Sequence, residues 1–426
     1  MNSLLVMGLT ILICGLSFFK PIVGVFVLVA TSWLGAIIPS EGVFTLNRVL
    51  GIIVLAGILL PQLIKRGKSP IGKFSTLEML FAIYFMVIFL SSFYSFSNSS
   101  ARELLLDVVT GFLLYFLIKM TVVSKTHLEN FVKMLVVISL VVATYSFYAA
   151  QNADPLSKRI YGEFQVNLAG TICYVGIVCA LWLSVAKKLP TLVAGIISMV
   201  LISVIFLSGT RSGLIALLSL AILFFLRILL TSAKRGRIIT ILALFAIGFF
   251  VSVKMVQSAF PLAVERVFSL TSFSISNPAS TDRLRVDLIN AAWLMFLDHP
   301  TLGIGFGNFN LNYGSYSQIF MNKQLMVHNI FMGALAETGI LGFISLMSIY
   351  IYIIYSALRA LYLQKSDPGI FDQWFPLMLF VGVNIVLAFL LYGTFDRLMF
   401  TIFAINMITL RNQQKNFSQQ HQEIGD

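Results

Sequence analysis

Apolar stretches long enough to cross a lipid bilayer recur along almost the whole chain. A transmembrane helix needs about 20 mostly apolar residues to span the hydrocarbon core. Only 11% of the residues are charged, whereas soluble domains contain about 25%. Because such a chain cannot cover its apolar surface in water, we predict a polytopic membrane protein.

The fold class follows from how a backbone satisfies its hydrogen bonds in lipid. Only helices and closed barrels do so, and the alternating pattern of barrel strands is absent. We therefore expect an all-α polytopic membrane protein with about 12–13 transmembrane helices and one large external loop containing short helices. The expected spans cover residues 3–19, 22–39, 49–64, 79–96, 108–123, 134–150, 165–186, 189–209, 214–233, 238–257, 328–350, 375–395 and 398–410.

Basic residues collect in alternate connections and orient the bundle, because cytoplasmic loops are enriched in Lys and Arg. These connections lie at 65–73, 119–133, 187–188, 234–237, 359–365 and 411–415. The net charge of +12 is thereby explained without a nucleic-acid partner. The expected organisation is transmembrane helices over 1–257, a large periplasmic or extracellular loop over 258–327, transmembrane helices over 328–410 and a disordered cytoplasmic tail over 411–426.

The external loop contains enough apolar and aromatic residues to fold against the bundle. Asp282 is a suitable N-cap for a helix over 283–297, and His299-Pro300 should end that helix. The glycines that follow permit turns that other residues resist; they are Gly303, Gly305 and Gly307. No strand precedes them and their spacing does not match a dinucleotide-binding loop. We interpret them as backbone packed tightly against the membrane surface.

The basic residues assigned to the external side are mostly arginines. Eight of the eleven are Arg, against six of eighteen on the cytoplasmic side. Guanidinium groups grip phosphate or carboxylate in a fixed two-pronged geometry, whereas Lys suffices for attraction to anionic lipid headgroups. The external face is therefore expected to bind an anionic ligand.

Arg211 is the strongest candidate among these arginines, because it lies between two apolar spans with almost no loop between them. A cation held so close to hydrocarbon usually marks a site or has a partner. The alternative is that its side chain extends to the water interface. Arg159 precedes another span and supports the same argument. Arg283 could pair with Asp287 on one helix, whereas Arg285 has no such local partner in that direction.

His328 is the candidate proton acceptor, because it opens an apolar span at its external end. His127 lies in a cytoplasmic loop, His421 in the tail, and His299 at a helix end where it would cap carbonyls. Histidine is the side chain best suited to take up a proton near neutral pH. On position alone, an interfacial polar anchor is an equally good interpretation of His328. Glu337 should face the opposite side of the same helix, as a buried structural acid.

The sequence contains no Asp-rich metal motif, nucleophilic Ser elbow, phosphate-binding loop or Cys–His pair, so we expect no metal and no cofactor. Its cysteines lie inside apolar runs and are interpreted as packing residues. A site of arginines and one histidine suits a substrate that carries its own phosphate leaving group. The arginines would neutralise a departing diphosphate, and the histidine could deprotonate an attacking hydroxyl.

On these residues the sequence resembles the O-antigen ligase and O-antigen polymerase superfamily of bacterial envelope glycosyltransferases. The resembling segments are Ser-Gly-Thr-Arg-Ser-Gly at 208–213, the helix at 283–293, Asp-His-Pro-Thr-Leu-Gly-Ile-Gly-Phe-Gly-Asn-Phe at 298–309, His-Asn at 328–329 and Leu-Ala-Glu-Thr-Gly-Ile-Leu-Gly at 335–342. The resemblance implies metal-independent transfer of a glycan from undecaprenyl diphosphate to an acceptor hydroxyl, at the outer face of the bacterial cytoplasmic (inner) membrane. It also implies that Arg211 and His328 belong to the active site. From the excess of external arginines, we further predict that Arg159, Arg283 and Arg285 help Arg211 to bind the diphosphate.

The acceptor remains open within this superfamily. A ligase would move a finished chain to a lipid acceptor in lipopolysaccharide or surface polysaccharide synthesis, a polymerase would join repeat units, and a protein O-oligosaccharyltransferase would modify a protein. A lipid-linked glycan transporter, the alternative from another class, usually shows inverted repeats or ionisable groups in mid-membrane, and we find no convincing internal repeat. We favour the ligase, whose partners would be the undecaprenyl-diphosphate-linked glycan, a lipid or glycan acceptor and membrane lipids.

Overall fold

The computed structural model describes residues 12–34, 46–64, 75–93, 99–154, 156–157, 166–230, 235–268, 281–319, 325, 327–363, 374–387 and 397–424. Across these residues the chain forms helices joined by turns and short connections, and it contains no strand. The predicted all-α membrane fold is therefore confirmed.

Six helices in the described part of the chain are long and apolar enough to cross a membrane. They are α5 (Ser99–Thr121), α6 (Lys125–Gln151), α7 (Val166–Val185), α9 (Arg211–Leu230), α10 (Arg235–Ala259) and α14 (Ile330–Leu363). Shorter apolar helices are α2 (Pro21–Trp33), α3 (Leu46–Ile64), α4 (Thr76–Ser92), α8 (Thr191–Leu207) and α15 (Trp374–Leu387). The others are α11 (Pro261–Phe268), α12 (Thr281–Asp298), α13 (Phe309–Tyr316) and α16 (Arg397–Ile424). Every span predicted between 22 and 410 overlaps one of these helices in the described part of the chain.

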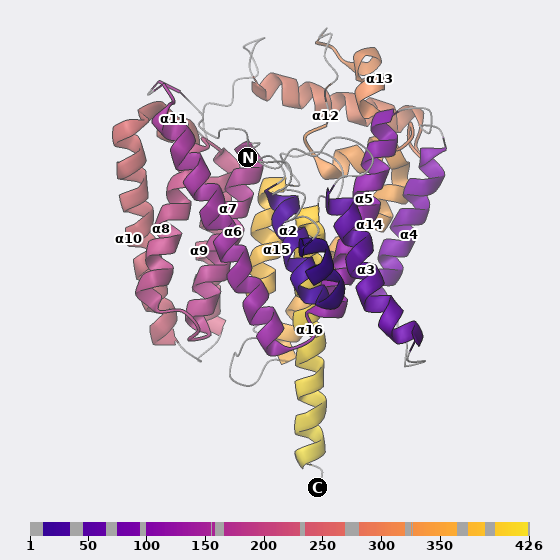
Figure 1. Cartoon of the computed structure of the whole chain (residues 1–426). Helices are drawn as coiled ribbons and strands as arrows, with labels where there is room; N and C mark the ends of the chain where they lie inside the picture. Colours follow the sequence, from indigo (N-terminus) through magenta and orange to yellow (C-terminus); the bar gives the residue numbers. More distant parts are fainter. Residues whose placement is uncertain are drawn as a thin grey trace.

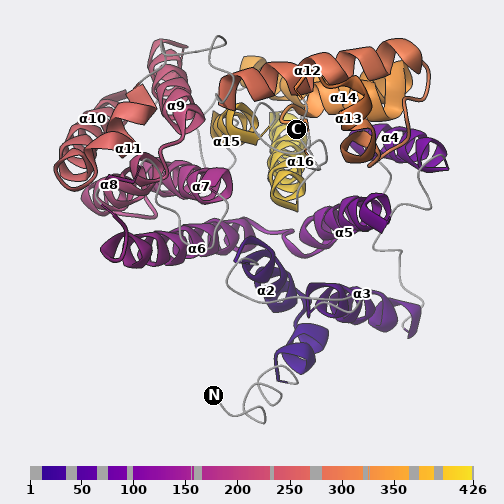
Figure 2. The same ribbon diagram turned by 90° about the horizontal axis from the view of Figure 1, so that it is seen from above.

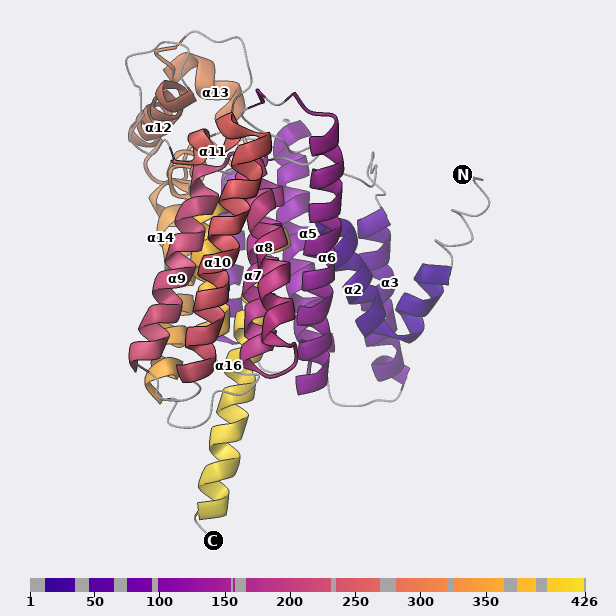
Figure 3. The same cartoon turned by 90° about the vertical axis from the view of Figure 1, so that its left-hand side faces the viewer.

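The helices stand side by side in one bundle whose two ends differ (Figure 1). α11, α12 and α13 lie at one end, called the loop end below, and the last part of α16 projects from the other. Seen from the loop end, α6 to α10 form one side of the bundle, α2, α3 and α5 a second, and α4, α12 and α14 a third (Figure 2). α12 runs across the loop end from the side of α9 toward α4 and packs over α14 (Figure 3).

The outward faces of the long helices are apolar, as a lipid environment requires. Phe250 on α10 is 69% exposed and Ile351 on α14 is 60% exposed. In contrast, α7 lies inside the bundle, and 94% of its residues from Leu168 to Val185 are buried. Because lipid is as apolar as the core, it favours insertion of each helix but does not select which helices pack together.

Two predicted boundaries differ from the structure. α12 begins at Thr281, so Asp282 lies in its first turn instead of at the N-cap, while its end at Asp298 agrees with the His299-Pro300 stop. The segment 411–426 was expected to be disordered, but α16 continues as far as Ile424. Extending an existing helix avoids the cost of nucleating a new one, and residues 412–424 contain no Gly or Pro.

Candidate functional site

Three of the helices that carry candidate site residues begin at the loop end of the bundle (Figure 1). α9 begins there with Arg211, α12 carries Arg283 and Arg285 in its first turns, and His328 directly precedes α14. The N-terminus of a helix carries a partial positive charge from its unpaired N–H groups, so it favours anions. This end of the bundle therefore combines arginine charges with helix N-termini.

Arg211 is presented by a sharp reversal between α8 and α9. Gly209 adopts a left-handed conformation (φ 60°), which glycine tolerates without a steric penalty. The hydroxyl of Ser208 donates to the carbonyl of Ile205 at 2.7 Å and lies 2.9 Å from the hydroxyl of Thr210. These bonds satisfy the buried hydroxyls of the reversal and fix the backbone at the start of α9, where Arg211 is half-buried.

α12 and α13 are tied together through one buried carboxylate, Asp287. It accepts hydrogen bonds from the Tyr313 hydroxyl at 2.6 Å, the Ser317 hydroxyl at 2.5 Å and the Gln318 backbone N–H at 2.9 Å. Burial, together with the bond to Asp287, raises the pKa of Tyr313 to about 12, so the phenol remains a donor at physiological pH. Asp287 therefore holds α12 to α13 and the residues after it, beyond any pairing with Arg283.

A small apolar core fixes this loop onto the bundle. It is formed by Leu288, Ala291, Ala292 and Met295 of α12, Phe309 and Tyr313 of α13, Val327, and Ala336 of α14. Burying a side chain such as Leu288 or Met295 is worth about 2 kcal/mol in water. Because Val327 belongs to this core, the adjacent His328 is held beside α12.

His328 stands immediately outside the first turn of α14. Asn329 caps this helix, because its side-chain oxygen accepts hydrogen bonds from the backbone N–H groups of Phe331 at 3.0 Å and Met332 at 3.1 Å. The cap fixes where α14 begins and thereby orients the half-buried His328. The resemblance to the O-antigen ligase superfamily includes the pair His328-Asn329 but implies no role for Asn329. An Asn before an apolar helix is nevertheless a recognised capping signal in a sequence.

α14 is broken at Gly339, where the predicted span 328–350 was expected to be continuous. Gly339 has φ 63° and ψ −162°, a conformation that is essentially restricted to glycine. The backbone N–H of Ile340 beyond the break donates to the carbonyl of Pro300 at 2.8 Å. The helix therefore exchanges one of its own hydrogen bonds for a bond to the segment that follows α12.

The segment that follows α12 also donates hydrogen bonds to α14. Its backbone N–H groups at Ile304 and Gly305 donate to the carbonyls of Ala336 at 2.9 Å and Glu337 at 3.2 Å. Gly303 has φ 69°, and a Cβ there would lie 2.6 Å from the Ala336 carbonyl oxygen. The glycines thus allow close backbone packing, as predicted, but against the broken helix α14.

Glu337 completes this contact as a buried acid, as the sequence had indicated. Its side-chain oxygen accepts a hydrogen bond from the backbone N–H of Phe309 at 3.2 Å, which is the first residue of α13. The Ser91 hydroxyl of α4 lies 2.6 Å from the Glu337 carbonyl oxygen and 3.0 Å from that of Leu302. The glycine junction, meaning residues 300–309 with 336–341, therefore joins α4, α13 and α14.

Substitution of Gly339 should test the glycine junction. In Gly339→Ala the added Cβ would lie 2.3 Å from the Thr301 carbonyl oxygen, in a backbone conformation unfavourable for alanine. We expect a loss of about 3 kcal/mol of stability, seen as a lower melting temperature of the purified protein in detergent. Gly314→Ala in α13 is the matched control, because its Cβ would meet nothing within 4 Å. Equal melting temperatures for the two variants would contradict the proposed junction.

The structure distributes the predicted site residues over two groups of helices. Arg283, Arg285 and His328 belong to the α12–α14 unit, whereas Arg211 belongs to α9, which packs against α7 and α15. α15 contacts both α9 and α14 and so lies between the two groups. Arg159 lies outside the described residues. Within the described ranges, no group of three or more His, Cys, Asp or Glu side chains is placed to hold a metal ion.

Comparison with known proteins gives one family match, which covers part of the chain. Residues 196–347 match the family model of O-antigen ligase, while a search of curated proteins found no significant match. The matched range runs from within α8 to within α14 and includes Arg211, the α12–α13 loop, His328 and the glycine junction. It indicates a ligase-like or polymerase-type role in glycan biosynthesis. The resemblance is thereby confirmed for residues 196–347, which match O-antigen ligase within a multi-pass membrane protein.

Proposed function

We propose that the protein transfers a glycan from undecaprenyl diphosphate to a hydroxyl of a lipid acceptor, at the outer face of the bacterial cytoplasmic membrane. The observation that supports the proposal is that Arg211, the arginines of α12 and His328 lie at or near the starts of helices at the loop end, on two groups of helices within the range that matches O-antigen ligase. Arg159 precedes α7 in sequence, and we include it as a further diphosphate ligand.

The proposed step is a displacement at the anomeric carbon of the glycan. The acceptor oxygen forms the new glycosidic bond while the bond between that carbon and the diphosphate oxygen breaks. The hydroxyl proton passes to a ring nitrogen of His328. The diphosphate leaves with the bonding electron pair, and Arg211, Arg283 and Arg285 stabilise the negative charge that develops on it.

Helix N-termini support this assignment. Arg211 and His328 lie at the starts of α9 and α14, where partial positive charge lowers the energy of a nearby diphosphate. The tight reversal before α9 and the Asn329 cap before α14 hold both residues on rigid backbone. Preorganised charge of this kind stabilises a transition state without reorganisation during the reaction.

A transfer assay tests the proposed function. Purified protein should convert an undecaprenyl-diphosphate-linked glycan and a lipid acceptor into glycosylated acceptor and free carrier diphosphate. Growth of the glycan on its own carrier, without the second acceptor, would instead identify a repeat-unit polymerase. Modification of a protein acceptor would identify a protein O-oligosaccharyltransferase. Movement of the intact donor across vesicles, without transfer, would overturn the enzyme assignment in favour of a transporter.

A further inference from the structure

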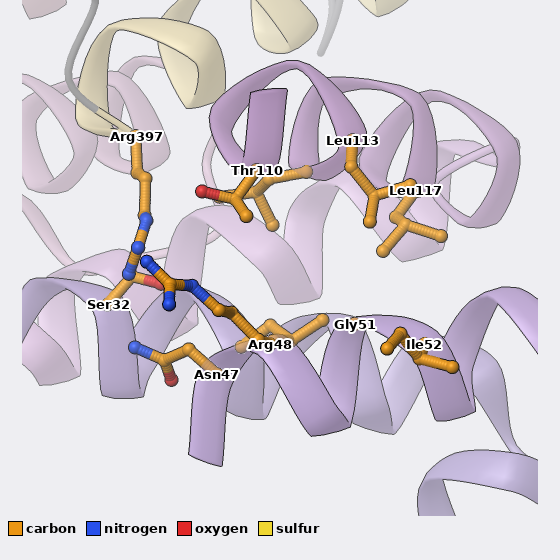
Figure 4. A pocket seen from close by; sticks show the side chains of 11 residues that line it. Ser32, Asn47, Arg48, Gly51, Ile52, Thr110, Leu113, Leu117 and Arg397 are labelled. Carbon is orange, nitrogen blue, oxygen red and sulfur yellow. The ribbon is translucent and has the colours of Figure 1, made fainter. Parts of the chain in front are cut away.

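A second candidate binding site lies away from the loop end residues discussed above. A cavity of about 220 Å³ opens between α2, α3 and α5, beside the first residue of α16 (Figure 4). Its volume is that of several water molecules, enough for a phosphate group and the first part of a lipid chain. Its lining includes Ser32, Asn47, Arg48, Ile52, Leu113 and Arg397.

The cavity is polar at one end and apolar at the other. Arg48 from the first turn of α3 and Arg397 from the start of α16 approach the polar end from opposite sides, near Ser32 and Asn47 (Figure 4). The apolar end is formed by side chains such as Leu113 of α5 (Figure 4). None of the described residues that line the cavity is acidic.

Arg397 is paired with an aspartate that lies outside the lining. Asp107 of α5 accepts a hydrogen bond from the Arg397 guanidinium at 2.9 Å, and its side chain is 53% exposed. That exposure leaves the ion pair screened by solvent and the guanidinium able to bind a further anion. The two guanidinium groups at the polar end of an apolar cavity form a donor arrangement that suits an anionic headgroup.

The position of the cavity indicates how a ligand would enter. Ile52 lines the cavity and is 61% exposed, on the surface of a bundle whose long helices expose apolar side chains to lipid. A lipid chain can therefore reach the apolar end directly from the bilayer. Figure 2 places α2, α3 and α5 on a different side of the bundle from α12 and α14, so the cavity is separate from the proposed active site.

We propose that this cavity binds the phosphate headgroup of an anionic lipid. The phosphate lies between Arg48 and Arg397, whose guanidinium groups offer paired N–H donors to its oxygens. The first part of the lipid chain lies along Ile52 and Leu113. This chemistry is shared by bilayer phospholipids and by a polyprenyl phosphate carrier, and it does not depend on the proposed glycan transfer.

Two substitutions separate the polar and apolar halves of the site. Arg48→Gln removes one guanidinium and keeps a shorter, uncharged polar side chain. Gly51→Leu fills the apolar end of the cavity from α3. Gly51→Ala is the matched control for the second, because its Cβ would lie 3.6 Å from a Leu113 methyl carbon, an ordinary van der Waals contact.

Lipid binding is measured on the full-length protein by native mass spectrometry, with the detergent-purified protein exposed to phosphatidylglycerol, undecaprenyl phosphate or phosphatidylcholine. We expect wild type and Gly51→Ala to retain an anionic lipid, and Arg48→Gln and Gly51→Leu to bind it at least about tenfold more weakly. Stronger retention of phosphatidylglycerol identifies a bilayer phospholipid as the occupant, and stronger retention of undecaprenyl phosphate identifies the carrier.

Retention of phosphatidylcholine equal to that of both anionic lipids would overturn the proposal, as would unchanged binding in Arg48→Gln. Gly51→Leu is used only if it elutes as a single species with the wild-type profile. If that variant fails to fold, lipid binding by Arg48→Lys is measured instead, because lysine keeps the positive charge but lacks the two-pronged guanidinium group. Anionic-lipid binding by Arg48→Lys that is intermediate between wild type and Arg48→Gln supports the phosphate site. Binding by Arg48→Lys as strong as that of wild type contradicts the proposed two-pronged contact.

Discussion

His328→Ala should reduce the rate of glycan transfer by about 10² to 10⁴-fold, the usual contribution of a general base. Without the imidazole, the acceptor hydroxyl has no side chain at this position to take its proton as the glycosidic bond forms. The variant should still bind the lipid-diphosphate donor, because donor binding is assigned to the arginines. Turnover and donor affinity are therefore measured separately, with purified protein and undecaprenyl-diphosphate glycan.

The control for this experiment is His299→Ala. His299 is exposed at the end of α12, where its backbone carbonyl accepts a hydrogen bond from the Gly303 N–H. Its side chain is not assigned to the reaction, so any effect should be mild and should act through folding. Normal turnover in His328→Ala would exclude it as the base. If the variant instead loses donor affinity but keeps its turnover rate at saturating donor, His328 would be reassigned to phosphate recognition.

Arg211→Ala should lower turnover by about 10² to 10³-fold, which is the typical cost of removing one group that stabilises developing negative charge. Arg211→Lys keeps the charge but loses the planar fork of N–H donors, so it should also impair transfer. The rigid reversal before α9 prevents the backbone from moving to compensate for the shorter donor. Both variants are compared with wild type in the same transfer assay.

Lys254→Ala is the matched control for Arg211→Ala. It removes one positive charge from an exposed position on α10, the helix that ends beside α11 at the loop end. Near wild-type turnover in this control would show that the effect of Arg211 is local and does not reflect net charge. Full activity of Arg211→Ala at normal expression would remove Arg211 from the proposed site.

The glycan-transfer predictions and the lipid-binding prediction can fail independently. The first depend on α9, α12 and α14, and the second on α2, α3, α5 and α16. A protein that transfers glycan without retaining an anionic lipid would leave the proposed function intact. A protein that retains the lipid but does not transfer glycan would leave the Arg48–Arg397 site intact.

The sequence by itself determined the features that depend on a single helix and its solvent. Apolar length placed the spans between 22 and 410, and Pro300 marked the end of α12. It also indicated that Glu337 is buried and that the glycines near 305 pack closely. These features are local because transfer of a helix into lipid depends on its own side chains and backbone.

Only the tertiary structure decided which distant residues meet. The break at Gly339 depends on backbone bonds to Pro300 and its neighbours, and Asp287 is held by α13 and the residues after it as well as by its own helix. Arg48 and Arg397 share one cavity although almost the whole chain separates them. Lipid gives no hydrophobic preference among helix partners, so packing and hydrogen bonds between distant segments make that choice. Such contacts leave no periodic pattern along the chain.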